Sequence, residues 1–295
     1  MKALTIFTPT YNRGYCLENC YNSLLKQTNQ NFIWLIIDDG STDNTKELIS
    51  RWMRESRLEI HYIWQENQGM HGAHNTAYEA IDTELNVCID SDDFMPEQAV
   101  EKILAFWEQH GSKNISGIIG LDAFKDHTII GTELPADVRT STLFDLYYKH
   151  KVTGDKKLVY RTELTKKYPY PIFKGEKYVG LAYKYYMLDK DFDMLLMNEV
   201  LCYVEYLEDG SSRNMLNQYR KNPKGFAFYR CELMKLPFTD FLFIFRQAVH
   251  YVSSSILSRN KKFISESPRK AVTVLAIPCG FLLYVYIQQL SRLLS

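Results

Sequence analysis

Cysteine pairs of the C-x-x-C type are absent from this chain of 295 residues. The six cysteines are scattered without a C-x-x-C pair, and two of them, Cys88 and Cys202, lie within apolar runs. This pattern disfavours a disulfide scaffold and favours buried free thiols in a reducing cytoplasm. We also expect no signal peptide, because Lys2 is followed at once by a strand-like run over residues 3–7.

Glycine-rich phosphate loops are absent as well. The first predicted turn has neither the G-x-G-x-x-G pattern of dinucleotide-binding folds nor the G-K-[ST] pattern of a P-loop. These absences disfavour an oxidoreductase and an ATPase. They also weaken the alternative of a nucleotidyltransferase, which would place a basic, glycine-rich loop after its first strand. Internal repeats and low-complexity segments are missing too.

The formal net charge of zero conceals two regions of opposite charge. Residues 1–210 contain 22 Lys+Arg against 32 Asp+Glu, a balance of −10, whereas residues 211–270 contain 12 against 3, a balance of +9. An acidic body with a basic tail indicates that the tail meets an anionic surface. We therefore predict a catalytic domain over residues 1–210 and a basic, aromatic and apolar helical region over residues 211–295.

Apolar runs alternate with helical patterns along the first 121 residues. Strands are predicted at 4–8, 32–38, 60–64, 85–89 and 115–121, with helices at 17–26, 44–55, 73–81 and 96–108. This alternation predicts an α/β fold, a mostly parallel sheet with helices on both faces. Further on, strands are predicted at 158–161 and 201–206 and helices at 143–148 and 179–188.

Polar turns follow three of the predicted strands, at residues 9–12, 38–41 and 90–93. Ligands of open α/β sheets bind beyond the carboxyl ends of the strands. The three turns therefore predict one site on one rim of the sheet.

The third turn contains three carboxylates in four positions: Asp90, Asp92 and Asp93. Carboxylates this close repel one another unless a cation lies among them, and hard oxygen ligands suit Mg²⁺ or Mn²⁺. We predict Asp92 as the primary metal ligand, with Asp93 as a second ligand or an orienting group. The alternative is a solvated acidic turn that caps the following helix.

Four motifs resemble those of the family 2 glycosyltransferases with a GT-A fold, in the same order and spacing. They are Thr-Pro-Thr-Tyr-Asn at 8–12, Asp-Asp-Gly-Ser-Thr-Asp at 38–43, the segment from Asn-Gln-Gly at 67–69 to Ala-His-Asn at 73–75, and Asp-Ser-Asp-Asp at 90–93. Together they cover roughly residues 1–110, and the second half matches more loosely.

The resemblance implies transfer of a sugar from a nucleotide-sugar donor, usually with a UDP leaving group, Mn²⁺ or Mg²⁺, and inversion at the sugar. It implies a nucleotide-sugar-binding half over 1–110 and an acceptor half over 111–210. A noncatalytic nucleotide-sugar-binding or scaffold protein with the same fold remains an alternative, although a scaffold has no need for clustered repelling charges.

The resemblance also implies a set of donor-site residues. Asp39 would accept an N–H group from a pyrimidine base, and Asp90 would contact the ribose directly or through the metal shell. His74 stands where many relatives place Arg, which supplies more charge to a diphosphate. Arg213 would close over the diphosphate. The full set is Thr8, Pro9, Thr10, Tyr11, Asn12, Asp39, Gly69, His74, Asn75, Asp90, Ser91 and Arg213.

Family members carry a carboxylate base in their second half, and the matching candidate here is Glu176. It precedes a predicted helix, and general-base catalysis needs a positioned carboxylate. The structural alternative is a glutamate at a helix N-terminus that interacts with the helix dipole.

The segment 271–291 contains no charged residue and follows the basic pairs 261–262 and 269–270. As a helix of about 20 residues it would reach about 30 Å and cross a bilayer, lie on its surface, or pack on the protein. Pro278 and Gly280 are expected to break it. We predict a cytoplasmic protein, peripheral or anchored at the inner face of the cell membrane, with a glycan or lipid-linked acceptor and no nucleic-acid partner.

Overall fold

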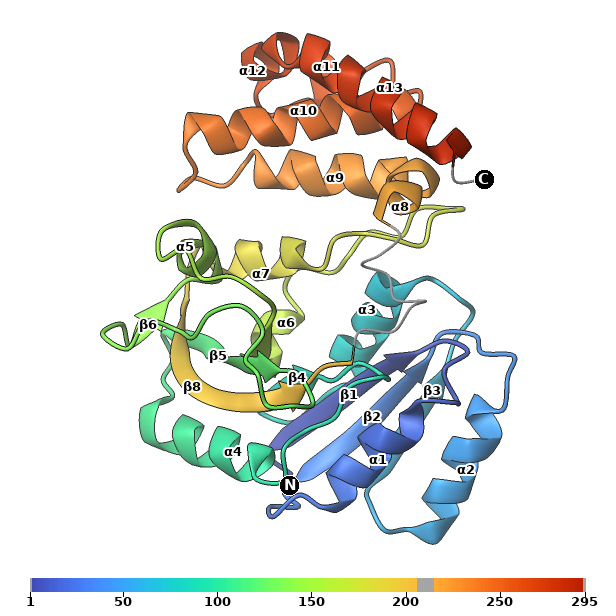
Figure 1. The fold of residues 1–295 in the computed structure, drawn as a ribbon, viewed down its shortest axis with the longest axis vertical. Helices are drawn as coiled ribbons and strands as arrows, with labels where there is room; N and C mark the ends of the chain where they lie inside the picture. Colours follow the sequence, from blue (N-terminus) through green and yellow to red (C-terminus); the bar gives the residue numbers. More distant parts are fainter. Residues whose placement is uncertain (1, 206–214, 294–295) are drawn as a thin grey trace. The chain divides into compact units, whose positions relative to one another are not determined.

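The structure is a computed structural model that describes residues 2–205 and 215–293 (Figure 1). It divides into two compact units. The first comprises Met1–Pro169 and Asp191–Leu207, and the second comprises Tyr170–Lys190 and Glu208–Ser295. The segment 170–190, which we expected in the catalytic domain, thus belongs to the same compact unit as the C-terminal helices.

A single sheet with the strand order β3-β2-β1-β4-β7-β5-β8-β6 organises the first unit. β1, β2, β3 and β4 are mutually parallel, whereas β7 runs antiparallel to both of its neighbours. The strands are β1 (Leu4–Thr10), β2 (Phe32–Asp38), β3 (Ile60–Trp64), β4 (Leu85–Cys88), β5 (Ile115–Ala123), β6 (Thr140–Ser141), β7 (Lys156–Arg161) and β8 (Asp193–Tyr203).

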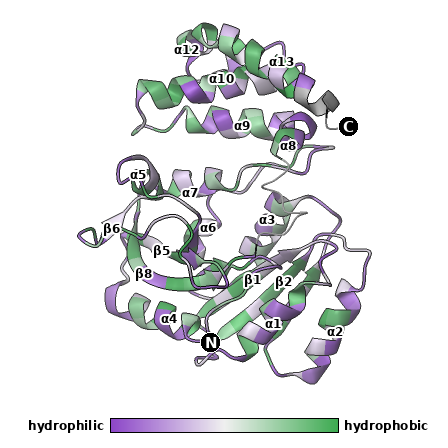
Figure 2. Cartoon of the chain, in the orientation of Figure 1, coloured by the Kyte–Doolittle hydropathy of each residue, from purple (hydrophilic) through white to green (hydrophobic). Residues whose placement is uncertain are grey.

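Helices cover both faces of this sheet, which confirms the predicted fold. Alternate residues of β1 and β2, among them Ile6 and Trp34, form a core with α1 (Leu17–Leu25), α2 (Thr45–Glu55) and α4 (Ala99–His110). On the other face Phe7 contacts two rings of α3 (Met70–Ala80). Side chains of a strand alternate between faces, so a strand buried on both faces is apolar throughout, as Figure 2 shows for β2. The unit also contains α5 (Leu143–Tyr148) and α6 (Thr162–Thr165).

Two departures from the predicted elements are at strand ends. β1 continues to Thr10, two residues beyond its predicted end, because Pro9 and Thr10 pair in register with Ile37 and Asp38 of β2. β8 begins at Asp193 rather than Leu201, where it pairs with Ile115 of β5.

The second unit is helical. Its elements are α7 (Ala182–Leu188), α8 (Met215–Lys221), α9 (Pro223–Leu233), α10 (Phe241–Leu257), α11 (Phe263–Glu266), α12 (Lys270–Leu275) and α13 (Ile277–Leu293). Met234, Ala248, Tyr251, Val252 and Ala276 form its small core, so α10 packs against the helices on either side of it in sequence.

Pro278 does not break the C-terminal segment. It lies in the first turn of α13, where proline is tolerated because the first N–H groups have no helical partner. Gly280 allows α13 to approach α10 closely, since a Cβ there would lie 2.6 Å from Val252. Within residues 2–205 and 215–293, no helix has both the length and the apolar character that crossing a membrane requires.

Candidate active site

Asp92 and Arg13 meet at the carboxyl ends of two neighbouring parallel strands. Arg13 follows β1, and Asp92 follows β4, which pairs with β1. Arg13 Nη1 lies 3.2 Å from Asp92 Oδ2, and each side chain is 19% exposed. Asp92 therefore presents a partly accessible carboxylate on the rim where the sequence predicts the site.

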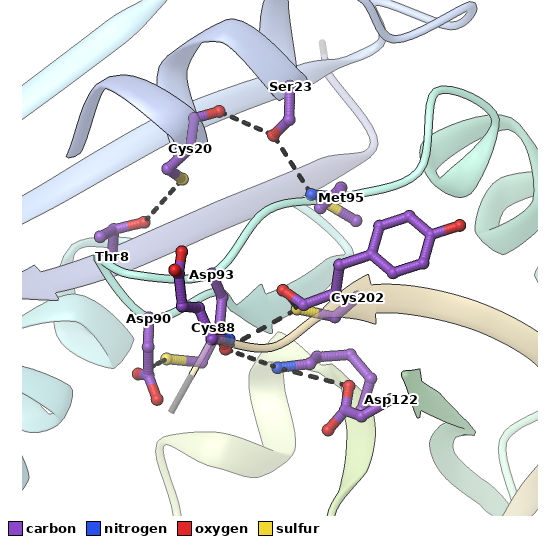
Figure 3. A network of polar contacts seen from close by, with 12 residues as sticks. Thr8, Cys20, Ser23, Cys88, Asp90, Asp93, Met95, Asp122 and Cys202 are labelled. Atoms are coloured by element: carbon purple, nitrogen blue, oxygen red, sulfur yellow. Dashed lines mark hydrogen bonds and ion pairs between the residues drawn. The ribbon is translucent and has the colours of Figure 1, made fainter. Parts of the chain in front are cut away.

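Asp93 points into the protein. Its Oδ1 accepts the backbone N–H of Glu205 at 3.3 Å, and its Oδ2 accepts the Cys202 thiol at 3.8 Å and lies 3.9 Å from Lys157 Nζ. Figure 3 shows Asp93 and Cys202 directed toward one another, with Asp122 beside them. This carboxylate therefore joins the acidic turn to the end of β8.

Lys157, on β7, supplies the buried positive charge of this network. Its Nζ also lies 3.7 Å from Asp122 Oδ1, and the side chains of both residues are almost fully buried. Burial raises the pKa of Asp93 and raises that of Asp122 to about 6, although Lys157 opposes both shifts. Burial by itself would lower the pKa of Lys157, but Asp122 and Asp93 outweigh it and hold that pKa above its usual range.

Asp90 is half-buried and accepts the Cys88 thiol at 3.7 Å, and its backbone carbonyl accepts the N–H of Asp93. Ser91 is buried within the same turn. The three carboxylates thus have different surroundings: Asp92 faces Arg13, Asp93 faces Lys157, and Asp90 faces Cys88.

Asp39 anchors the loop that leads into α3. Its two oxygens accept the N–H groups of Gln68 and Gly69 at 2.8 Å each and the side-chain amide of Gln65 at 2.7 Å. Gly69 has a φ of 82°, a left-handed conformation that favours glycine. The predicted contact of Asp39 with a base is untested, and the carboxylate already holds this loop. Asp38 accepts Ser41 N–H and Tyr62 O–H and thereby fixes the loop after β2.

Asn12 ties the first polar turn to the second. Its Oδ1 accepts the N–H of Thr42 at 2.7 Å, and its own N–H donates to Ser41 Oγ at 2.8 Å. Beside it, Tyr11 is 49% exposed. The first turn therefore combines a fixed backbone with an accessible aromatic ring.

Two of the predicted donor-site residues are buried. The Thr8 hydroxyl lies in the core, where it accepts the indole N–H of Trp34 at 3.0 Å. His74 is 1% exposed, packs edge-on against Phe7, and lies 3.7 Å from the Cys88 sulfur. Neither side chain reaches the rim.

The other predicted donor-site residues have varied surroundings. Pro9 lies within β1 rather than in the turn, and the buried Thr10 hydroxyl has no hydrogen-bond partner among the residues that the structure describes. Asn75 is half-buried on α3. Arg213 lies outside the described residues.

Glu176 is buried and caps a helix. Its oxygens accept the N–H groups of Lys224 at 3.1 Å and Gly225 at 2.8 Å, which belong to the first turn of α9. Asn222 completes the junction by accepting the N–H of Lys177. Glu176 therefore stabilises the N-terminus of a helix, and its role as a base stays a prediction.

Sequence reasoning missed Arg13 and Lys157. Arg13 directly follows the first motif, so its position in the predicted rim turn was the available signal. Lys157 lies one residue before the strand that we predicted to begin at Leu158, whereas the observed strand includes it. A lysine inside a buried strand is unusual, and this would have been the signal.

The chemistry of Asp92 fits a divalent cation. Mg²⁺ and related ions are commonly held by one or two carboxylates, with substrate phosphates completing the shell. Among the described residues, no group of three or more His, Cys, Asp or Glu side chains is arranged to hold a metal by itself. Asp92 therefore fits a metal that is held jointly by the protein and a phosphate ligand.

The chain matches the family model described as glycosyl transferase family 2 over residues 5–168, more than half of its length. It belongs to this family. Family 2 membership speaks against the nucleotidyltransferase alternative and accounts for the four motifs along residues 8–93.

Curated relatives of this family 2 protein match over different lengths. An uncharacterized glycosyltransferase of Nostoc sp. is 30% identical over 105 residues, 36% of this chain and 33% of that protein. GlyG of Streptococcus pneumoniae is 32% identical over 118 residues, 40% of this chain and 38% of that protein. The match thus spans well under half the length of these two relatives. The putative teichuronic acid biosynthesis glycosyltransferase TuaG of Bacillus subtilis is 26% identical over 259 residues, 87% of this chain and 97% of that protein.

Solved structures support the same fold. Staphylococcus aureus TarS 1–349 in complex with UDP-GlcNAc has a TM-score of 0.64 at 16% identity, covering 98% of this chain and 91% of that one. The Pyrobaculum calidifontis mannosyltransferase PcManGT, in complex with GDP-Man and Mn²⁺, has a TM-score of 0.54 at 15% identity, covering 96% and 87%. At these identities the likeness establishes the fold alone.

Proposed function

We propose that this protein transfers a sugar from a nucleotide-diphosphate sugar, a UDP-sugar by family analogy, to a glycan or lipid-linked glycan during synthesis of a cell-surface polymer. The observation that carries the proposal is the accessible carboxylate of Asp92 at the carboxyl ends of β1 and β4. Support for the polymer class comes from TuaG, which matches along nearly its whole length. Support for the donor class comes from the UDP-GlcNAc complex of TarS.

A Mn²⁺ or Mg²⁺ ion bound at Asp92 would stabilise the negative charge that develops on the departing diphosphate. The chain's own residues prepare the site for this step. Asp39 fixes the loop 65–69, Asn12 fixes the first turn against the second, and Asp93 holds the acidic turn against the end of β8. Together they position Asp92 and leave the exposed Tyr11 ring available to stack on a base.

Glu176 is our proposed base for the acceptor hydroxyl, in a reaction that inverts the sugar. A carboxylate has about four acceptor positions, so the two backbone N–H groups leave about two of them for further hydrogen bonds. In this proposal the cap on α9 also orients the carboxylate for proton transfer.

We further propose that the second unit brings the enzyme to the cytoplasmic face of a membrane. Leu275 of α12 and Phe281 and Leu282 of α13 are 60%, 52% and 68% exposed, and the basic residues 261–262 and 269–270 lie on neighbouring segments. Apolar side chains flanked by basic ones suit peripheral binding to anionic lipid.

A panel of nucleotide sugars tests the proposed reaction. UDP-, GDP- and CMP-sugars are added with Mn²⁺, and the unfolding temperature and the release of the nucleotide are measured. One donor that both stabilises the protein and is consumed would support the proposal. Stabilisation without turnover, even with candidate acceptors, would support the noncatalytic binding protein instead.

A further inference from the structure

The ion pair between Arg13 and Asp92 places a fixed positive charge where the proposed metal would bind. Arg13 Nη1 lies 3.2 Å from Asp92 Oδ2, and both side chains are partly accessible on the rim. A metal that ligates Asp92 must therefore approach the guanidinium as well as the carboxylate.

Hydrogen bonds hold the backbone of Arg13 in place. Its carbonyl accepts the N–H groups of Cys16 and Leu17 at 3.1 and 3.3 Å, and the preceding Asn12 is bonded to Ser41 and Thr42. The guanidinium lies 5.9 Å from the centre of the Tyr15 ring, which is exposed. Only the long side chain has to shift for the guanidinium to change partners.

Two other basic side chains near the acidic turn, within residues 2–205, have partners of their own. Lys157 is buried between Asp93 and Asp122, and His74 lies in the core beneath Cys88. Among the residues that the structure describes, Arg13 is therefore the cation best placed to meet an anion that arrives at Asp92.

Two cations at one carboxylate repel each other. The repulsion grows as the two charges approach one another, and a divalent ion doubles it. An anion between the two cations converts this repulsion into attraction. A diphosphate does so well, since the planar fork of arginine matches the geometry of phosphate oxygens.

We propose that Arg13 is a diphosphate-binding residue that neutralises Asp92 in the free protein and shifts onto the diphosphate when metal and nucleotide bind together. This inference rests on the proposed function and adds a residue and a binding order to it. Metal alone has to displace Arg13 and binds weakly, whereas nucleotide and metal each strengthen the binding of the other.

The test separates nucleotide binding from metal binding in Arg13→Gln, Arg13→Lys and the wild-type protein. Arg51→Gln is the matched control, since Arg51 is an exposed arginine of the same unit that pairs with Glu55 on its own helix. Calorimetry measures UDP binding at saturating Mn²⁺, and electron paramagnetic resonance measures Mn²⁺ binding without nucleotide. Thermal unfolding of each variant checks the fold.

We expect Arg13→Gln to weaken UDP binding by about 10- to 100-fold, as for the loss of charge-assisted hydrogen bonds, and to strengthen Mn²⁺ binding in the absence of nucleotide. Arg13→Lys should lie between wild type and Arg13→Gln, and Arg51→Gln should match wild type in both measurements. Unchanged UDP binding in Arg13→Gln would overturn this inference and leave the proposed function standing. So would a parallel loss of UDP and Mn²⁺ binding, because it would make Arg13 a support for the metal site.

A wild-type protein that binds Mn²⁺ but no nucleoside diphosphate would overturn the proposed function and this inference with it. The two failures are thus distinguishable.

Discussion

The ammonium group of Lys157 lies 3.9 Å from a carboxylate oxygen of Asp93, and both side chains are buried. The same carboxylate accepts the backbone N–H of Glu205, so the pair connects β7, the acidic turn and the end of β8. In this arrangement Asp93 stabilises the turn from within, and Asp92 is the carboxylate that faces the rim.

Replacing Lys157 should therefore destabilise the first unit. Lys157→Met leaves Asp93 and Asp122 buried without their cation, which costs about 3–5 kcal/mol in comparable buried pairs. Urea unfolding measures the loss. Lys102→Met is the control, because its ion pair with Glu199 is exposed and contributes at most about 1 kcal/mol. Equal stabilities of the two variants would contradict the role assigned to Lys157.

Glu176→Gln separates catalysis from helix capping. If Glu176 is the base, the variant should lose about 100-fold or more in transfer rate while keeping UDP affinity. Asn222→Ala loosens the same junction without removing a carboxylate, so it should lose stability but keep turnover. Comparable activity losses in the two variants would assign Glu176 to capping alone.

His250 should make the stability of the second unit pH-dependent. Burial, together with Arg230 and Arg246, lowers the pKa of His250 from 6.5 to about 4. Between these pH values the unfolded chain binds more protons than the folded one. The contribution of His250 to the free energy of unfolding is therefore complete above pH 6.5 and is lost as the pH falls toward 4. The difference amounts to about 3 kcal/mol at most.

The wild-type protein is compared with His250→Phe, a variant that keeps an aromatic ring beside Tyr219 but has no titratable group at this position. Chemical unfolding at several pH values between 7 and 4 should give a shallower loss of stability for the variant. Carboxylates titrate equally in both proteins, so parallel curves would contradict the assignment to His250.

Membrane binding should depend on exposed side chains of α13 rather than on the presence of the helix. Phe281→Ser with Leu282→Ser removes apolar surface and keeps the packing of Ala276 and Gly280 against α10. We expect binding to anionic phosphatidylglycerol vesicles to fall at least about tenfold, since each buried apolar side chain contributes about 1.5–3 kcal/mol. Met53→Ser, on the exposed surface of α2, is the control. Wild-type protein that does not sediment with such vesicles would refute the proposal.

Deletion of residues 268–295 is a poorer test of membrane binding. It removes Ala276 from the core of the second unit and uncovers Val252, so loss of binding would not be separable from loss of structure.

The sequence predicted the first half of the fold closely because its elements are locally encoded. β2 and β3 have the predicted bounds, Phe32–Asp38 and Ile60–Trp64, since both are apolar runs between clear turns. The antiparallel course of β7 was not predictable, because strand direction depends on pairing with β4 and β5, which are distant in sequence.

The candidate site was predictable as a location but less so residue by residue. The motif residues Asp92 and Asn12 lie at the expected rim, whereas Thr8 and His74 point into the core because side chains alternate along β1 and because α3 packs one face on Phe7. Pairings such as Arg13 with Asp92 and Lys157 with Asp93 arise from tertiary contacts, so spacing along the chain carries little sign of them.

Metal-dependent turnover in wild type and Asp92→Asn tests the central claim most directly. With the donor identified from the panel, the rate of nucleotide release is measured against Mn²⁺ concentration, with Asp82→Asn as an exposed control. We predict Mn²⁺-dependent turnover in wild type and in Asp82→Asn, and a loss of at least about 100-fold in Asp92→Asn with its fold intact. Full activity of Asp92→Asn, or of wild type after removal of divalent metal, would contradict the account.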